Sequence, residues 1–289
     1  MTKLDNHINY SILMSVYYKE KPEFLKQSIE SIYNQTIPTD DFVLVCDGPL
    51  STELEEVINI TKEKMGDTLQ IVRLSQNVGL GKALNIGIDY CKNELIARMD
   101  SDDISYLNRC EQQLKVFIER PEVSICSGIV EEFSESINNI EAKRVLPEKN
   151  KEIVEFAKKR NPFNHPCVMY KKSAVKSAGS YQDFYLLEDY YLWLRMIFNG
   201  CQGYNLQIPL LYMRAGVNMY KRRSGWKYVK TQVALFKFMR RAGFINNKQY
   251  MGFRFLYCYY VKCDNNVPIS DCKKNADFFF FCSCSTSNL

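Results

Sequence analysis

Short apolar runs alternate with helical patterns over the first hundred residues. The runs cover residues 10–17, 41–46, 69–74 and 95–97. Each has the length and composition of a buried strand. Between the runs, apolar side chains recur at three- and four-residue spacing from Pro22, from Thr52, which we expect to cap its helix, and from Lys82 to about residue 91. This alternation predicts an α/β fold with a doubly wound, mostly parallel sheet.

Polar and glycine-rich features follow all four predicted strands. They are Ser15-Val16-Tyr17, Asp47-Gly48, the glycine-rich loop 77–81 with its Asn77, and Asp100-Ser101-Asp102-Asp103. In sheets of this kind, ligands bind beyond the carboxyl ends of the strands. We therefore expect these four features to converge on one rim of the sheet and to form the functional site.

The acidic cluster is the strongest single candidate for chemistry. Asp100, Asp102 and Asp103 lie within four positions, directly after an apolar strand. Mg²⁺ is usually held by one or two carboxylates together with substrate phosphates. The alternative is a solvated acidic turn that opens a helix. The chain has no GxGxxG after the first strand and no GxxxxGK[ST], which argues against dinucleotide binding and P-loop hydrolysis. The remaining interpretation is a site that binds a nucleotide-diphosphate donor together with a metal ion.

Composition narrows the class of protein. The chain has 289 residues, 46% of them hydrophobic, and a net charge of +5. This mild charge does not predict a nucleic-acid partner. Six of the eleven cysteines lie singly in apolar stretches, which favours a reducing compartment. The first residues do not resemble a signal peptide, and no apolar run approaches 18 residues. We therefore expect a cytoplasmic protein.

The C-terminal third is basic and aromatic. From Trp226, apolar residues at helical spacing alternate with Lys227, Lys230, Lys237, Arg240 and Arg241. This pattern predicts an amphipathic helix that lies on an anionic membrane surface. Packing of its apolar face on the rest of the protein would explain the pattern equally well. No role is predicted for the cysteine- and phenylalanine-rich tail, residues 264–289.

The order of these motifs resembles glycosyltransferase family two, with the GT-A fold. Further matching motifs occur later in the chain. They are Gln35-Thr36, Ala83-x-Asn85-x-Gly87, Asn161-Pro162-Phe163-Asn164-His165-Pro166, Gly179-x-Tyr181, the run from Glu188-Asp189 to Arg195, and Tyr220-Lys221-Arg222-Arg223. The second half is similar to bacterial O-antigen, capsule and exopolysaccharide transferases of the amylovoran-biosynthesis type. Cys46 stands where the family commonly has the first of two aspartates, and Pro49 where it has serine.

The resemblance implies three segments and a reaction. A catalytic domain would cover residues 1–212, with a nucleotide half at about 8–104 and an acceptor half at about 105–212. A basic helical extension would follow at 213–263. The reaction would be inverting transfer of a hexose, galactose or glucose, from a UDP-sugar to a saccharide on polyprenyl diphosphate. This chemistry would place the enzyme at the inner face of the bacterial cell membrane.

The resemblance also assigns roles to residues. Mn²⁺ or Mg²⁺ would be held by Asp102 or Asp103. Asp189 would be the general base, and Glu188 would orient the acceptor or replace Asp189. The donor-binding residues would be Ser15, Val16, Tyr17, Asp47 (on the base), Asn77, Lys82, Asp100 and Ser101. The acceptor-binding residues would be His165, Trp193, Arg222 and Arg223. For Trp193 a core position is an alternative, and for Glu188 and Asp189 a role in helix capping.

Two other functions fit parts of the pattern. A nucleotidyltransferase also pairs a nucleotide-binding fold with acidic metal ligands, but it would need glycine, Arg and Lys directly after the first strand, where this chain has Tyr17-Tyr18-Lys19-Glu20. A non-catalytic sugar- or lipid-binding scaffold would keep the fold without its carboxylates. Asp100, Asp102, Asp103, Glu188 and Asp189 are all present.

Overall fold

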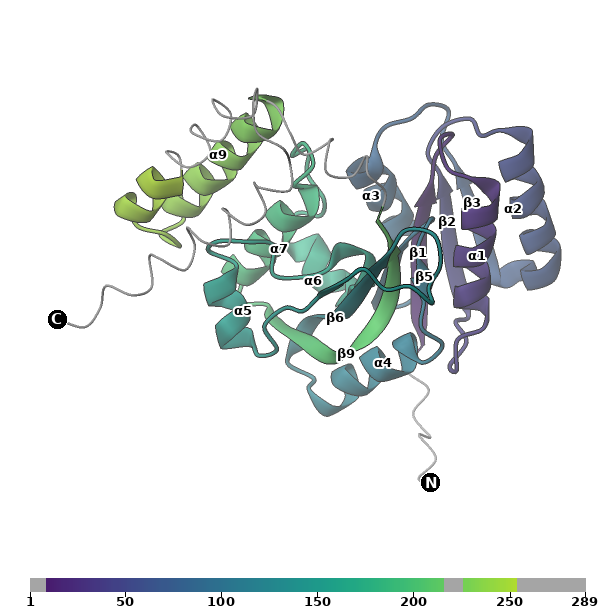
Figure 1. Ribbon diagram of the computed structural model, residues 1–289, viewed down its shortest axis with the longest axis horizontal. Helices are drawn as coiled ribbons and strands as arrows, with labels where there is room; N and C mark the ends of the chain where they lie inside the picture. The colour runs from purple at the N-terminus through teal and green to yellow at the C-terminus, as the bar shows by residue number, and fades with distance from the viewer. Residues whose placement is uncertain (1–8, 216–225, 254–289) are drawn as a thin grey trace. The chain divides into compact units, whose positions relative to one another are not determined.

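The computed structural model describes residues 9–215 and 226–253, which belong to two compact units that divide between Met219 and Tyr220. The first unit is built on a nine-stranded sheet (Figure 1). Its strands are β1 (Tyr10–Val16), β2 (Asp41–Cys46), β3 (Leu69–Arg73), β4 (Leu95–Asp100), β5 (Ile104–Ser105), β6 (Val123–Phe133), β7 (Ala142–Arg144), β8 (Met169–Lys171) and β9 (Gln202–Arg214). The α/β fold with helices around a central sheet is confirmed.

The first half of the sheet follows the sequence prediction, and the second half does not. Strands β3, β2, β1 and β4 lie side by side and are parallel. Beyond β4, the short strand β8 is antiparallel to both β4 and β6, whereas β6 and β9 are parallel. The described sheet is therefore mixed, with long parallel pairings and short antiparallel ones. The expected domain boundary at residue 212 falls inside β9, which continues to Arg214.

Helices cover both faces of the sheet. They are α1 (Pro22–Tyr33), α2 (Thr52–Met65), α3 (Leu80–Tyr90), α4 (Arg109–Glu119), α5 (Asn150–Phe156), α6 (Lys172–Ser177) and α7 (Glu188–Phe198), with 3₁₀ turns at Gly66–Thr68 and His165–Cys167. Ile12 and Met14 of β1 point into a core shared with α1, α2 and α4, while Leu13 points into one shared with α3 and α7. This alternation is the period-two pattern of a strand buried on both faces.

Helix α3 packs unusually close to the sheet. A Cβ at Gly87 would lie 2.4 Å from Leu13 Cδ1 and 2.7 Å from Val45 Cγ2. Only glycine allows this approach, because real Cβ atoms do not come within 3 Å of other heavy atoms. The Gly87 position of the sequence motif is therefore a packing requirement. It fixes α3 against β1 and β2.

The cap of α2 differs from the prediction by one residue. Ser51, not Thr52, is the N-cap, and its hydroxyl accepts the Leu54 N–H at 3.4 Å. Thr52 is the first helical residue. A serine one position earlier can satisfy the same unpaired donors of the first turn.

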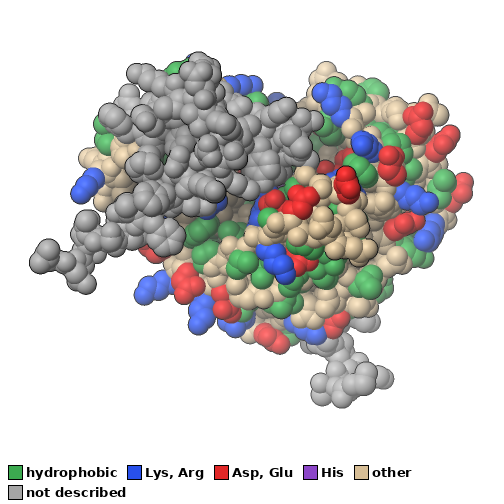
Figure 2. Space-filling model, viewed as in Figure 1, with side chains coloured by type: hydrophobic (Ala, Val, Ile, Leu, Met, Phe, Trp, Pro, Cys, Tyr) green, Lys and Arg blue, Asp and Glu red, His purple; other side chains and the backbone are tan. Residues whose placement is uncertain are grey.

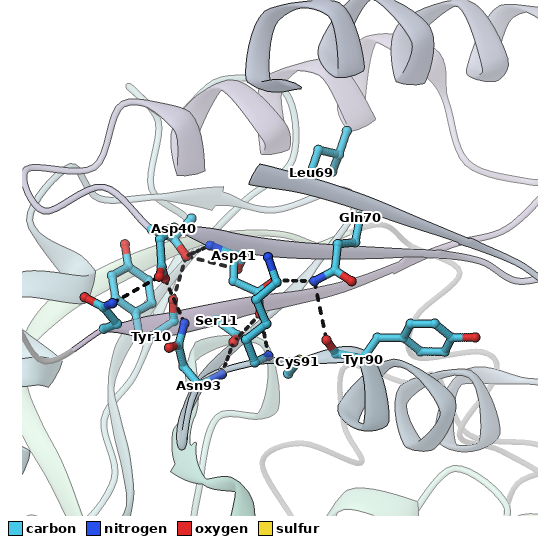
Figure 3. Close-up of polar contacts among 12 residues, drawn as sticks. Tyr10, Ser11, Asp40, Asp41, Leu69, Gln70, Tyr90, Cys91 and Asn93 are labelled. Atoms are coloured by element: carbon cyan, nitrogen blue, oxygen red, sulfur yellow. Dashed lines mark hydrogen bonds and ion pairs between the residues drawn. The ribbon is translucent and has the colours of Figure 1, made fainter. Parts of the chain in front are cut away.

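A buried acidic residue, Asp41, lies at the rim of the sheet where the parallel strands begin. Asp41 has no exposed surface and accepts hydrogen bonds from Ser11 Oγ at 2.6 Å, from the Lys92 N–H at 2.7 Å and from Gln70 (Figure 3). These contacts join β1, β2, β3 and the turn between α3 and β4. A buried carboxylate with this many donors stabilises the sheet, and its position separates it from the site described below.

The second unit contains the expected basic helix. Helix α9 spans Trp226–Arg241 and buries Val229, Leu235, Phe236 and Met239. Phe236 stacks on Phe253, with ring centroids 4.2 Å apart. The rest of the predicted basic extension, residues 216–225 and 254–263, lies outside the described residues. None of the described helices is long and apolar enough to cross a bilayer. On the first unit, acidic and basic side chains are interspersed over the face drawn in Figure 2.

Candidate active site

The carboxyl ends of β1, β2 and β4 meet at one rim, as expected. Ser15 of β1 pairs in register with Val45 on one side and with Asp100 on the other. Asp47 follows Val45 by two residues, and its N–H donates to the Val16 carbonyl at 2.7 Å. Three of the four predicted features are therefore neighbours through the strand register alone.

Asp100 is held by a buried arginine. Arg98, which has no exposed surface, binds the Asp100 carboxylate through both terminal nitrogens, one of them at 2.9 Å. Such two-point pairing fixes a carboxylate in orientation as well as position. Next to it, Ser101 Oγ donates to Glu20 Oε2 at 2.5 Å. Both Asp100 and Ser101 are thus engaged by protein partners at the edge of the site.

Asp102 and Asp103 differ in their access to solvent. Asp102 is half-buried, whereas Asp103 is 1% exposed. Burial, with the charges of Asp100 and Glu20, raises the pKa of Asp102 to about 7. Burial and the neighbouring Asp102 also raise the pKa of Asp103 well above its usual range. Asp103 Oδ1 accepts the Arg214 N–H at 2.9 Å, and within the described chain Oδ2 has no hydrogen-bond partner.

These two carboxylates fit a divalent cation that is shared with a substrate. The described residues contain no group of three acidic, histidine or cysteine side chains arranged as a closed metal site. Mg²⁺ and Mn²⁺ do not require one, because substrate phosphates and water complete the coordination. Two crowded carboxylates with raised pKa values, one of them with an oxygen that lacks a partner, are the donor set that a cation would stabilise.

The carboxylate of Asp47 anchors the glycine-rich loop. It accepts the N–H of Val78 at 2.7 Å, the N–H of Gly79 at 3.0 Å and Asn77 Nδ2 at 3.1 Å. Asp47 is 3% exposed. The next residue, Gly48, has φ of +91°, and a Cβ there would lie 2.7 Å from the Asn77 N. In this structure, therefore, Asp47 and Asn77 hold the loop against the end of β2.

Glu188 and Asp189 begin α7 and approach the glycine-rich loop from the other half of the sheet. A Cβ at Gly81, in the first turn of α3, would lie 3.5 Å from Glu188 Cβ. Asp189 Oδ2 accepts Asn161 Nδ2 at 2.6 Å. The predicted catalytic pair thus lies beside the predicted donor loop, although more than 100 residues separate Gly81 from Glu188.

The comparisons with known proteins decide the family. The family model described as "Glycosyl transferase family 2" matches residues 11–179. The amylovoran biosynthesis glycosyltransferase AmsE of Erwinia amylovora is 43% identical over 244 residues, which cover 83% of this chain and 90% of that protein. The chain belongs to glycosyl transferase family 2.

Two further similarities concern the family and its fold. The Escherichia coli protein named UDP-Gal:alpha-D-GlcNAc-diphosphoundecaprenol beta-1,3-galactosyltransferase is 36% identical, covering 86% of this chain and 89% of that protein. The crystal structure of S. aureus TarS 1-349 with UDP-GlcNAc has a TM-score of 0.65 at 14% identity, covering 91% of this chain and 77% of that one. The latter shows the fold alone. Membership of this family makes the protein a glycosyltransferase rather than a nucleotidyltransferase.

Three predicted binding residues of the transferase pack or hydrogen-bond within the protein. Val16 has no exposed surface, and its side chain packs in the core. Trp193 is likewise fully buried, packed against Phe163 and His165. The core alternative therefore replaces acceptor binding for Trp193, because a completely buried ring cannot contact an acceptor. His165 is half-buried, and its Nε2 lies 2.9 Å from Tyr181 Oη.

Other predicted residues remain at or outside the edge of the described site. Lys82 is exposed in the first turn of α3, and Tyr17 is half-buried at the end of β1. Their roles in donor binding stay predictions. Arg222 and Arg223 lie outside the described residues, as does the rest of their motif.

The sequence prediction missed two arginines of the transferase site. Arg98 supports Asp100, and Arg214, at the end of β9, reaches the acidic cluster. Arg214 Nε donates to the Asp102 carbonyl at 3.2 Å, and its guanidinium lies 3.8 Å from the centre of the Phe24 ring. The sequence could have predicted the role of Arg98, because an arginine inside an apolar strand, two residues before an aspartate, needs a charged partner. Nothing local in the sequence brings Arg214 to a cluster more than 100 residues away.

Proposed function

We propose that this transferase moves a hexose, galactose or glucose, from a UDP-sugar to a saccharide on polyprenyl diphosphate, with inversion at the anomeric carbon. The product would be a repeat unit of O-antigen or capsular polysaccharide. The observation that carries the proposal is the closeness of Gly81, in the donor loop, to Glu188, the first residue of the predicted catalytic pair. The name of the E. coli relative, at 36% identity, supports the choice of galactose and of a lipid diphosphate.

The acidic cluster would serve the leaving group. Asp102 and Asp103 would hold a divalent cation, which would supply positive charge to the departing diphosphate. Asp102 is the better direct ligand because it is half-buried, while Asp103 is buried with one oxygen bonded to Arg214. Mn²⁺ in the Pyrobaculum calidifontis mannosyltransferase structure, with a TM-score of 0.60 at 12% identity, is a property of that protein. It makes Mn²⁺ the first ion to test.

The carboxylates of α7 would serve the acceptor. Asp189 takes the proton from the acceptor hydroxyl as that oxygen attacks the anomeric carbon from the face opposite the diphosphate. The amide of Asn161 donates to Asp189 Oδ2 at 2.6 Å and so holds the carboxylate in a fixed orientation. Glu188, which packs beside Gly81 at the donor loop, would orient the acceptor sugar.

The acceptor's lipid would bring the enzyme to the inner face of the cell membrane. The cationic residues of α9 are exposed, while four apolar residues of the helix are buried. The exposed cations are Lys227, Lys230, Lys237, Arg240 and Arg241, and the buried residues are Val229, Leu235, Phe236 and Met239. Each cation near an anionic surface contributes about 1 kcal/mol of binding. Cosedimentation with anionic vesicles tests this step. Equal binding to neutral and anionic vesicles would remove the role of the cations, and no binding to either would remove the membrane from the proposal.

The main experiment measures sugar transfer from a panel of nucleotide sugars. The acceptor probe is GlcNAc-diphosphoundecaprenol, with Mn²⁺ or with EDTA. We expect transfer from UDP-galactose or UDP-glucose only with the metal, and a product with inverted anomeric configuration by NMR. Asp189→Asn should reduce transfer by about 10²- to 10⁴-fold, the range for loss of a general base. The control is Asp183→Asn, because Asp183 is exposed in the segment before α7. Full transfer in EDTA would overturn the metal role, and unchanged transfer in Asp189→Asn and Glu188→Gln would overturn the base.

A further inference from the structure

The segment between α6 and α7, residues 178–187, is fastened at its start by side chains from two other elements. From α3, Asn85 makes a double hydrogen bond with the backbone of Tyr181: its Nδ2 donates to the Tyr181 carbonyl at 2.5 Å, and its Oδ1 accepts the Tyr181 N–H at 2.8 Å. An amide side chain matched to both backbone groups of one residue replaces a strand pairing that this segment lacks. It ties the segment to the helix that follows the donor loop.

The second fastening comes from α7 itself. Arg195 donates through its two terminal nitrogens to the carbonyls of Ala178 and Ser180, the latter at 2.6 Å. Gly179 lies between them with φ of +80°, and a Cβ there would lie 3.2 Å from the guanidinium. The planar fork of arginine spans two carbonyls at once, which an ammonium cannot do. The last turn of α7 is thereby bonded to the start of the segment that leads into its first turn.

The backbone within this segment is strained. Ser180 has φ of +55° and Leu186 has φ of +58°. A bulky residue such as leucine adopts this left-handed region only where its surroundings require it. Leu186 precedes Glu188 by two residues, so the strain lies directly before the predicted catalytic pair.

We propose that Asn85 and Arg195 are positioning residues, which together hold residues 178–187 so that Glu188 and Asp189 face the donor loop at the correct distance. The proposal rests on the proposed function of the Glu188–Asp189 pair. Asn85 lies four residues after Gly81, on the same face of α3, and Gly81 is the residue beside Glu188. One face of α3 therefore contacts both ends of the segment: Tyr181 near its start and Glu188 directly after its end.

This arrangement has a kinetic consequence. A shift of the acceptor base by about 1 Å can cost about 10²-fold in rate without weakening the binding of the donor, because only the geometry of attack changes. The hydrogen bonds of Asn85 and Arg195 to residues 178–181 together form a clamp on this segment. Loss of the clamp should therefore lower kcat for transfer and leave the KM for the nucleotide sugar nearly unchanged. A general loss of folding would instead lower the melting temperature and affect both constants.

The test compares four variants of the full chain. Asn85→Leu removes both bonds to Tyr181, Asn85→Asp keeps only the acceptor, Arg195→Lys keeps one bond, and Arg195→Gln removes the fork and its charge. The matched control is Asn93→Leu, because Asn93 donates to Asp40 at 2.8 Å at the opposite rim of the sheet (Figure 3). The readouts are kcat and KM with UDP-galactose, GlcNAc-diphosphoundecaprenol and Mn²⁺, the melting temperature, and hydrogen exchange of the Tyr181 amide.

We expect Asn85→Leu and Arg195→Gln to lower kcat about 10- to 100-fold with a change in KM for UDP-galactose of less than about threefold, and Asn85→Asp and Arg195→Lys to fall between them and the wild type. Tyr181 amide exchange should accelerate in Asn85→Leu and not in Asn85→Asp or Asn93→Leu. Wild-type kcat in Asn85→Leu, or an unchanged Tyr181 amide, would overturn the proposal even if transfer required Asp189. Wild-type transfer in Asp189→Asn would instead overturn the proposed base, whereas the exchange result would still decide whether the clamp exists.

Discussion

Arg98 and Asp100 form a two-point ion pair at the end of β4, with the arginine completely buried and the side chain of Asp100 35% exposed. The guanidinium points along the strand toward the acidic cluster. It supplies a permanent positive charge that favours the ionised forms of Asp100 and Asp103, which would otherwise repel each other.

Replacement of Arg98 should destabilise the protein more than removal of the whole pair. Breaking a buried ion pair costs about 3–5 kcal/mol, and the partial exposure of Asp100 reduces this to about 2–3 kcal/mol for Arg98→Met. The double variant Arg98→Met/Asp100→Asn should recover part of the loss, because no uncompensated charge remains. Urea unfolding of the four proteins of this cycle measures the coupling. Additive effects of the two substitutions would show that the pair contributes no coupling energy.

Asp47→Asn should release the glycine-rich loop. The new amide would face the N–H groups of Val78 and Gly79 with a donor in place of one acceptor oxygen. An unsatisfied buried donor costs about 1–3 kcal/mol. We therefore expect a lower urea midpoint and faster hydrogen exchange at residues 77–81. If exchange there were unchanged, the carboxylate would not be what holds the loop.

The burial of His165 predicts an acid-dependent loss of stability. Burial and the nearby Arg98 charge lower the pKa of His165 well below its usual 6.5. The unfolded state therefore binds a proton to this histidine more readily than the folded state does. The stability that depends on the neutral His165 ring is complete above pH 6.5 and is lost as the pH falls below that value. His165→Gln should lose less stability than the wild type between pH 7 and pH 5, measured by urea midpoints. His7→Gln, which changes the other histidine, is the control, and parallel curves for wild type and His165→Gln would contradict the prediction.

Asp102→Asn should have opposite effects on the stability of the metal-free protein and on metal binding. Because the pKa of Asp102 is raised to about 7 from 3.8, its contribution to stability falls as the pH rises through this range. In EDTA at pH 8 the variant should therefore melt at a higher temperature than the wild type, by about 2–4 °C for each kcal/mol gained. With saturating Mn²⁺ and UDP, the wild type should gain stability and the variant much less. An equal gain in both proteins would remove Asp102 from the metal site.

Much of the nucleotide-binding half was predictable from local patterns. Apolar runs of strand length at 10–17, 41–46, 69–74 and 95–97, separated by helical spacing, leave few topologies other than parallel strands with crossover helices. The rim follows from the same rule, because the carboxyl ends of neighbouring parallel strands lie at one edge. The convergence of Ser15, Asp47 and Asp100 needed no knowledge of the tertiary structure.

The second half of the sheet was not predictable in this way. Strands β5, β7 and β8 have two or three residues each, which is too short for a period-two pattern to stand out. Strand β8 pairs with β4 and β6 because the fold brings it there, not because of its own composition. The mixed character of the sheet is therefore a property of the tertiary structure.

The sequence by itself determined the family, the α/β fold and which residue types gather at the rim, since these depend on spacing along the chain. Only the tertiary structure decided what each side chain contacts. Asp47 anchors a loop, Trp193 is core, and Asn85 pairs with a residue 96 positions away. The physical reason is that a hydrogen bond depends on the direction and position of two groups to within a fraction of an ångström, and for distant residues only the packed chain sets both.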